Sequence, residues 1–273
     1  MFLKQNALYL HANLTIETNK LCCRVFIMAN ETDRTQAIVL STVPINDHSQ
    51  FVHLYTEQYG RMTCRIPLAS KGKRANRLRT MMTPMTVLDL VLKGNPSDEI
   101  RSISEAQIVQ SPYMLTLSHP DKSAQCLYMA ELIAHTVREE EANPQLWDYI
   151  LASLTILEQC EAGWANFHLV FTCGLIAQLG FSVDTSNYEQ GCQFDLVEGI
   201  FTTSPILHPY YLNEKSARWF CKLFDTHYDT MQQLDVNRAG RDYLLDTLLI
   251  FLGQHIPEMG RLKSVDVLKS LFE

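Results

Sequence analysis

Seven cationic residues are concentrated between Arg61 and Arg79, in a stretch that contains no Asp or Glu. This basic strip consists of Arg61, Arg65, Lys71, Lys73, Arg74, Arg77 and Arg79. The whole chain has 23 Lys and Arg residues and a net charge of −7 at pH 7, so the strip is a local exception on an acidic protein. Clustered cations neutralise phosphates and release the counterions that nucleic acid condenses, which gives affinity without reading base sequence. The strip therefore predicts a contact with DNA or RNA, and the competing interpretation is a solvated basic loop without a partner.

Three aromatic residues precede or adjoin the strip, namely Phe51, Tyr55 and Tyr59. Aromatic side chains beside a basic groove can stack on unpaired bases. Phe51 and Tyr55 share one face of a predicted strand, and Val52 and Leu54 share the other. The sequence leaves open which face points inward, and for all three aromatics it favours packing in the core over base stacking.

Short apolar and β-branched segments separated by turn signals predict five strands before residue 111. Their ranges are Thr35–Val43, Gln50–Thr56, Arg61–Ala69, Val87–Lys93 and Ile100–Gln110. Five short strands in so few residues are typical of a small closed barrel such as the OB-fold, which leaves no exposed sheet edge. The strip covers the third strand and a segment, Ser70–Thr80, that the pattern around Gly72 predicts to be a loop.

From residue 111 onward the apolar residues recur at helical spacing, for example Leu146, Ile150 and Leu154, with Asn143 as the expected N-cap before Pro144. A small hairpin is predicted over Phe194–Phe201. The fold class is therefore α+β, with an OB-fold DNA-binding domain at 35–110 and a mainly helical domain at 111–273. Residues 1–34 are expected to be an N-terminal extension, with Met28 as a candidate for the true start.

No motif of an enzyme active site occurs in the sequence. Ser70-Lys71-Gly72-Lys73 lacks the upstream glycine and the Lys-Ser/Thr pair of a P-loop, and GxSxG, HExxH and GxGxxG are absent. The eight cysteines are scattered without a CxxC pair, which fits a reducing cytoplasm, and residues 1–27 contain no apolar segment of a secretion signal. These observations predict a cytoplasmic, non-enzymatic protein without a cofactor.

The ordered set of segments resembles the RecO family of DNA-repair proteins over about residues 35–272. The resemblance is carried by Leu54-Tyr55-Thr56 with Tyr59-Gly60-Arg61, Ala69–Arg74, Pro84–Leu90, the 194–201 hairpin, Arg238 with Arg241, and the segment 255–268. It implies an OB barrel packed on a helical bundle, and binding of single- and double-stranded DNA with annealing of complementary strands. It also implies help in replacing single-strand-binding protein with RecA, together with RecR.

Many family members carry two CxxC pairs around the hairpin that hold a structural zinc. In this sequence only Cys192 remains in the first pair, and Thr202-Thr203 occupy the second, so we expect no metal. A weaker cationic set in the helical region could receive an acidic partner tail, although a mixed helix surface is the favoured interpretation; it consists of Arg218, Lys222, Arg238 and Arg241.

Two alternatives remain open from the sequence alone. The chain could be a protein–protein adaptor whose basic strip binds an acidic peptide instead of DNA. It could also be an enzyme with a dispersed active site, which a deep pocket with converging titratable groups would indicate.

Overall fold

The computed structural model describes residues 33–67, 73–95, 98–111, 119–257 and 259–271, without the side chains of residues 73–76. The chain divides into two units, Met1–Asp33 and Arg34–Glu273, and every element below lies in the second. The predicted N-terminal extension lies almost entirely outside the described residues.

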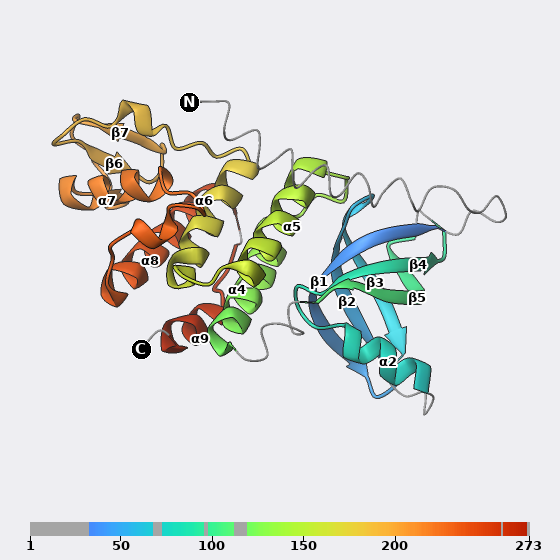
Figure 1. Ribbon diagram of the computed structural model, residues 1–273. Helices are drawn as coiled ribbons and strands as arrows, with labels where there is room; N and C mark the ends of the chain where they lie inside the picture. Colours follow the sequence, from blue (N-terminus) through green and yellow to red (C-terminus); the bar gives the residue numbers. More distant parts are fainter. Residues whose placement is uncertain (1–32, 68–72, 96–97, 112–118, 258, 272–273) are drawn as a thin grey trace. The chain divides into compact units, whose positions relative to one another are not determined.

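Five strands close into a barrel in the order β1-β2-β3-β5-β4, with β4 hydrogen-bonded back to β1 (Figure 1). The strands are β1 (Arg34–Asn46), β2 (Ser49–Thr56), β3 (Gly60–Pro67), β4 (Val87–Lys93) and β5 (Ile100–Gln110). The β3–β5 pair is parallel and the other neighbours are antiparallel. The predicted five-stranded OB-type barrel is confirmed, and the bounds predicted for the last two strands agree with those of β4 and β5.

Alternation along β2 decides which side chains fill the barrel. Val52 and Leu54 are fully buried in its interior cluster with Cys64 and Ile66 of β3. Successive side chains of a strand point to opposite faces, so Phe51 and His53 lie on the outer surface.

The predicted loop over Ser70–Thr80 is wrong for the part that the structure describes, because an α-helix, α2 (Lys73–Met81), occupies it. Leu78 and Met81 are one helical turn apart, and both are buried against the barrel interior together with Met82. The helix forms because it covers apolar residues at the end of the barrel, and its Lys, Arg and Ala residues have good helix propensity.

The remainder is mainly helical, as predicted. The helices are α4 (Pro120–Thr136), α5 (Pro144–Gln159), α6 (Phe167–Gln178), α7 (Glu214–Phe224), α8 (Arg238–His255) and α9 (Ser264–Leu271), with 3-10 turns at Trp164–Asn166, Thr185–Asn187 and Met231–Gln233. Asn143 caps α5 as predicted, because its side chain accepts a hydrogen bond from the Leu146 amide. Leu146, Ile150 and Leu154 are buried in one large cluster.

The predicted hairpin belongs to a three-stranded sheet of order β7-β6-β8. Its strands are β6 (Gln193–Asp195), β7 (Ile200–Thr202) and β8 (Tyr211–Leu212). Among the described residues, no helix is both long enough and apolar enough to cross a membrane.

Candidate nucleic-acid interface

Phe51 and Arg65 lie opposite each other on neighbouring strands, on the outer surface of the barrel. Phe51 is half-buried and Arg65 is exposed, whereas their neighbours Val52 and Cys64 are buried inside. Residues directly opposite in an antiparallel pair stand on the same face. The barrel therefore presents an aromatic ring and a guanidinium together to solvent.

This pair is the centre of a row that crosses four strands, from Val43 through Phe51 and Arg65 to Ser102, and we call it the outer row. Val43 has 46% of its surface exposed, so it adds an apolar group to the row. Beside the row, Arg65 and Ser102 line a cavity of about 310 Å³ with residues of the β1–β2 turn; its full lining is His48, Ser49, Arg65, Ile66, Pro67, Ser102 and Ile103. The surface thus combines a flat ring, a cation and a hollow.

His53 and Thr63 occupy the next row of the same face. The Nδ1 atom of His53 is 3.0 Å from the Thr63 hydroxyl oxygen. Burial, followed by the charge of Arg61, lowers the pKa of His53, which favours a neutral ring. Sequence reasoning overlooked Val43, Ser102 and this pair as surface partners of the strip, although strand alternation could have placed His53 beside Phe51.

The described cations of the basic strip do not all lie on one face. Arg77 and Arg79 are exposed on α2, and their separation by two residues directs them to different sides of that helix. Among the described residues, Arg65, Arg77 and Arg79 form no ion pair. The backbones of Lys73 and Arg74 lie in α2 but their side chains are not described, and Lys71 lies outside the described residues.

Among the described side chains of the strip, Arg61 has an intramolecular role. Its Nη1 atom donates to the carbonyl oxygens of Ala134, at 2.8 Å, and Val137, at 3.1 Å, at the end of α4. Its amide also donates to the carbonyl of Glu139, at 2.9 Å. Burial, followed by the charge of Arg138, lowers the pKa of Arg61. Arg61 therefore joins the barrel to the segment that follows α4.

Two of the three candidate aromatic residues also have structural partners. Tyr55 is 1% exposed, and its ring centroid lies 6.1 Å from that of Trp147 in the helical region. Tyr59 lies under the guanidinium of Arg101, 5.6 Å from its ring centroid, and packs on the barrel cluster. Of the three, Phe51 has the ring that the outer surface leaves accessible.

In the weaker cationic set of the helical region, two arginines have partners within the protein and two cations are exposed. Arg238 donates to the carbonyl of Lys269 at 3.0 Å and lies 3.9 Å from a carboxylate oxygen of Asp242. Arg241 donates to the carbonyl of Val236 at 3.0 Å. Arg218 and Lys222, in contrast, are exposed on α7.

The donor atoms around the small sheet do not fit a structural zinc ion. Cys192 and Cys221 are both buried, and Thr202 and Thr203 provide no thiol. Burial, with contributions from Asp225 and Cys192, raises the pKa of Cys221 to about 11, so the buried thiol is protonated at neutral pH. No group of three or more potential metal ligands occurs in the described part of the chain.

Two family models match the chain. The one described as Recombination protein O N terminal matches residues 28–112, and the one described as Recombination protein O C terminal matches residues 117–266. The DNA repair protein RecO of Bacteroides fragilis strain ATCC 25285 is 32% identical over 241 residues, which cover 88% of this chain and 99% of that protein. The proteins of the same name from Azobacteroides pseudotrichonymphae and Flavobacterium psychrophilum are 29% and 27% identical, each over 88% of this chain and over 99% and 98% of their own lengths.

Proposed function

The chain belongs to the RecO family of DNA repair and recombination proteins, and on this premise we propose that it binds DNA through the outer surface of its barrel. The observation that carries the proposal is the Phe51–Arg65 pair in the outer row. OB-folds bind oligonucleotides on the face of strands 2 and 3 and with the loop between strands 1 and 2. The outer row and its adjoining cavity occupy these positions.

In this interface, cations bind the phosphates and an aromatic ring stacks on a base. Arg65 on the outer surface neutralises a phosphate, and Arg77 and Arg79, on different sides of α2, add charge that a strand meets along that helix; such contacts hold single or double strands regardless of sequence. Phe51 stacks on an unpaired base and adds affinity for single strands. Arg61 contributes indirectly, because it fixes the barrel against the end of α4.

The biological role that fits this chemistry is a recombination mediator. The protein anneals complementary strands and helps to load RecA onto strands coated by single-strand-binding protein, with RecR as its partner. Family membership and the free cations of the barrel support this role, which includes no catalytic step.

A salt series on single-stranded oligo-dT tests the proposal. Each phosphate contact with a single strand contributes about −0.7 to the slope of log K against log salt. Substitution of Arg65, Arg77 and Arg79 by Ala should therefore make the slope less steep by about 2. A control variant removes two exposed charges in the helical region, those of Arg261 and Lys263, and it should leave the slope unchanged.

A slope near zero for the wild-type protein would refute DNA binding by charge. The basic strip would instead be an adaptor surface if the protein binds a Glu-rich peptide but no oligonucleotide. Peptide binding should then be lost in the same triple variant.

A further inference from the structure

Most described cations of the helical region are engaged within the protein. Lys122 donates to the carbonyl oxygens of Glu158 and Cys160 at the end of α5. The same holds for Arg138 with the Pro257 carbonyl, Arg238 with Asp242, Arg241 with the Val236 carbonyl, Arg261 with Asp266 and Lys269 with Asp246. Among the described helices of this region, α7 is the one on which cations without an ion pair gather.

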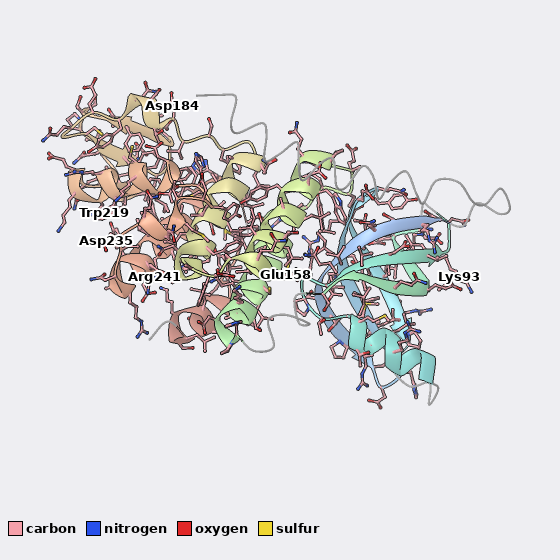
Figure 2. All side chains as sticks on the ribbon, viewed as in Figure 1. Lys93, Glu158, Asp184, Trp219, Asp235 and Arg241 are labelled. Atoms are coloured by element: carbon pink, nitrogen blue, oxygen red, sulfur yellow. The ribbon has the colours of Figure 1, made fainter. Side chains whose placement is uncertain are left out.

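One side of α7 is basic and carries a tryptophan. Lys215, Arg218 and Lys222 are exposed, and they follow each other at three and four residues, which places them along one side of the helix. Trp219, labelled in Figure 2, follows Arg218 directly in α7 and is half-buried. We call these four residues the α7 basic face. The opposite side of the helix, with Ala217, Phe220 and Leu223, is buried in the large core cluster.

The described carboxylates near the α7 basic face do not form ion pairs with its cations, so the face keeps its positive charge. Glu214 is in the first turn of α7, where the helix dipole favours a negative charge. Asp225 accepts a hydrogen bond from the Thr185 hydroxyl at 2.6 Å, and on α8 Asp242 and Asp246 pair with other cations. In the described part of the chain, none of the three cations on α7 forms an ion pair.

The ring of Trp219 is half-buried and has a cation over it. The ammonium group of Lys222, which is exposed, lies over this ring at 5.2 Å from its centroid. Such an exposed cation–π contact is weak, so the ammonium can move to a phosphate while a base takes its place on the ring.

We propose that the α7 basic face binds a second DNA single strand, separate from the strand held by the barrel. The inference rests on the proposed function. The polyanionic backbone complements the three cations, and the tryptophan provides a stacking surface that an acidic peptide does not need. The main neighbours of α7 are α6, β6 and β8, so this face is built independently of the barrel. Two strands held by one chain would be brought close together, which favours annealing.

Strand stoichiometry on the full chain is the primary test. Oligo-dT strands too short to span both surfaces are titrated at low salt and at concentrations well above the dissociation constant. The wild-type protein should saturate at two strands per chain, and Arg218→Ser/Lys222→Ser at one strand. The control Arg261→Ser/Lys263→Ser removes the same charge elsewhere and should still bind two. Annealing of complementary strands should slow at least tenfold in the α7 variant and stay unchanged in the Arg261→Ser/Lys263→Ser control.

Fluorescence of Trp219 gives a second readout that does not depend on removing charge. Binding of the second strand should quench part of the tryptophan emission, and Trp219→Phe should abolish this phase. The barrel variant lacking Arg65, Arg77 and Arg79 should retain it, with one strand per chain.

Unchanged stoichiometry and annealing in the α7 variant would overturn the inference while leaving the proposed function intact. The inference would also be overturned if the wild-type protein binds one strand per chain and the α7 variant loses only its affinity for a Glu-rich peptide. A wild-type protein that binds no strand would refute the proposed function itself.

Discussion

The guanidinium of Arg61 donates to the carbonyl oxygen of Ala134 at 2.8 Å, and this bond connects the third strand of the barrel to the end of α4. The unsatisfied carbonyls at the end of a helix carry partial negative charge, so a cation stabilises them. A residue that the sequence places in a nucleic-acid contact thus holds two parts of the protein together.

Substitution of Arg61 by Ala should lower the free energy of unfolding by about 1.5–3 kcal/mol, because hydrogen bonds from a charged group to two carbonyls are lost. Urea unfolding followed by circular dichroism measures this change. Arg65→Ala, two residues along the same strand and exposed, is the control and should change stability by less than about 0.5 kcal/mol. Equal effects of the two substitutions would argue against the junction role of Arg61.

Gly60 allows the start of β3 to approach the backbone of Glu139 and Glu141 closely. Its φ is +62°, and a Cβ atom there would lie 2.6 Å from the carbonyl oxygen of Glu139 and overlap that of Glu141. Gly180 has a φ of +86° with no atom within 4 Å of such a Cβ, so it has the backbone strain without the overlap. Gly180→Ala should cost about 1–2 kcal/mol of stability, and Gly60→Ala about 3 kcal/mol or more. Similar costs in thermal or urea unfolding would show that the approach of the two segments is not tight.

Much of the barrel was predictable from the sequence, because strand alternation and turn residues are local signals. The bounds of β4 and β5 agree with the prediction for this reason. Helix α2 was missed because its apolar residues, Leu78 and Met81, stand near its end, behind cationic residues and a glycine that indicate a loop. Its formation depends on covering the end of the barrel, which is a tertiary effect.

The density of charge along the sequence does not show which way each cationic side chain points. Arg61 finds its acceptors 73 and 76 residues further along the chain, at a helix end whose position no local pattern specifies. The inward or outward orientation of Phe51 was also undecided, because both faces of β2 carry large apolar residues. Burial of Val52 and Leu54 settles that orientation.

Phe51→Ala should weaken binding to single-stranded oligo-dT by roughly 5- to 150-fold, the effect of losing one stacked base at about 1–3 kcal/mol. Double-stranded DNA, whose bases are already stacked, should bind with nearly unchanged affinity. Fluorescence anisotropy with both substrates measures the two effects. Val43→Ala removes an exposed apolar group of the same row without removing a ring, and it should have a much smaller effect. An equally large loss in that variant would assign the role of Phe51 to general apolar contact.

His168 makes the stability of the helical region dependent on pH. It is 3% exposed, its ring packs edge-on against Tyr128, and burial, followed by the charge of Arg241, lowers its pKa to about 3. The unfolded chain takes up a proton at this residue near pH 6.5, whereas the folded protein does not until about pH 3. Stability is therefore fully present above pH 6.5 and is lost as the pH falls through this window.

Between pH 7.5 and pH 5 this residue should account for a loss of about 2 kcal/mol in the free energy of unfolding. His168→Gln should lose that much less than the wild-type protein over the same interval, whatever its own stability at pH 7.5. His227→Gln, at an exposed histidine, is the control and should follow the wild-type dependence. If the free energy of unfolding depends on pH in the same way in the wild-type protein and in His168→Gln, the buried His168 ring takes up its proton in the folded state as readily as in the unfolded chain. That result would contradict a neutral ring packed against Tyr128.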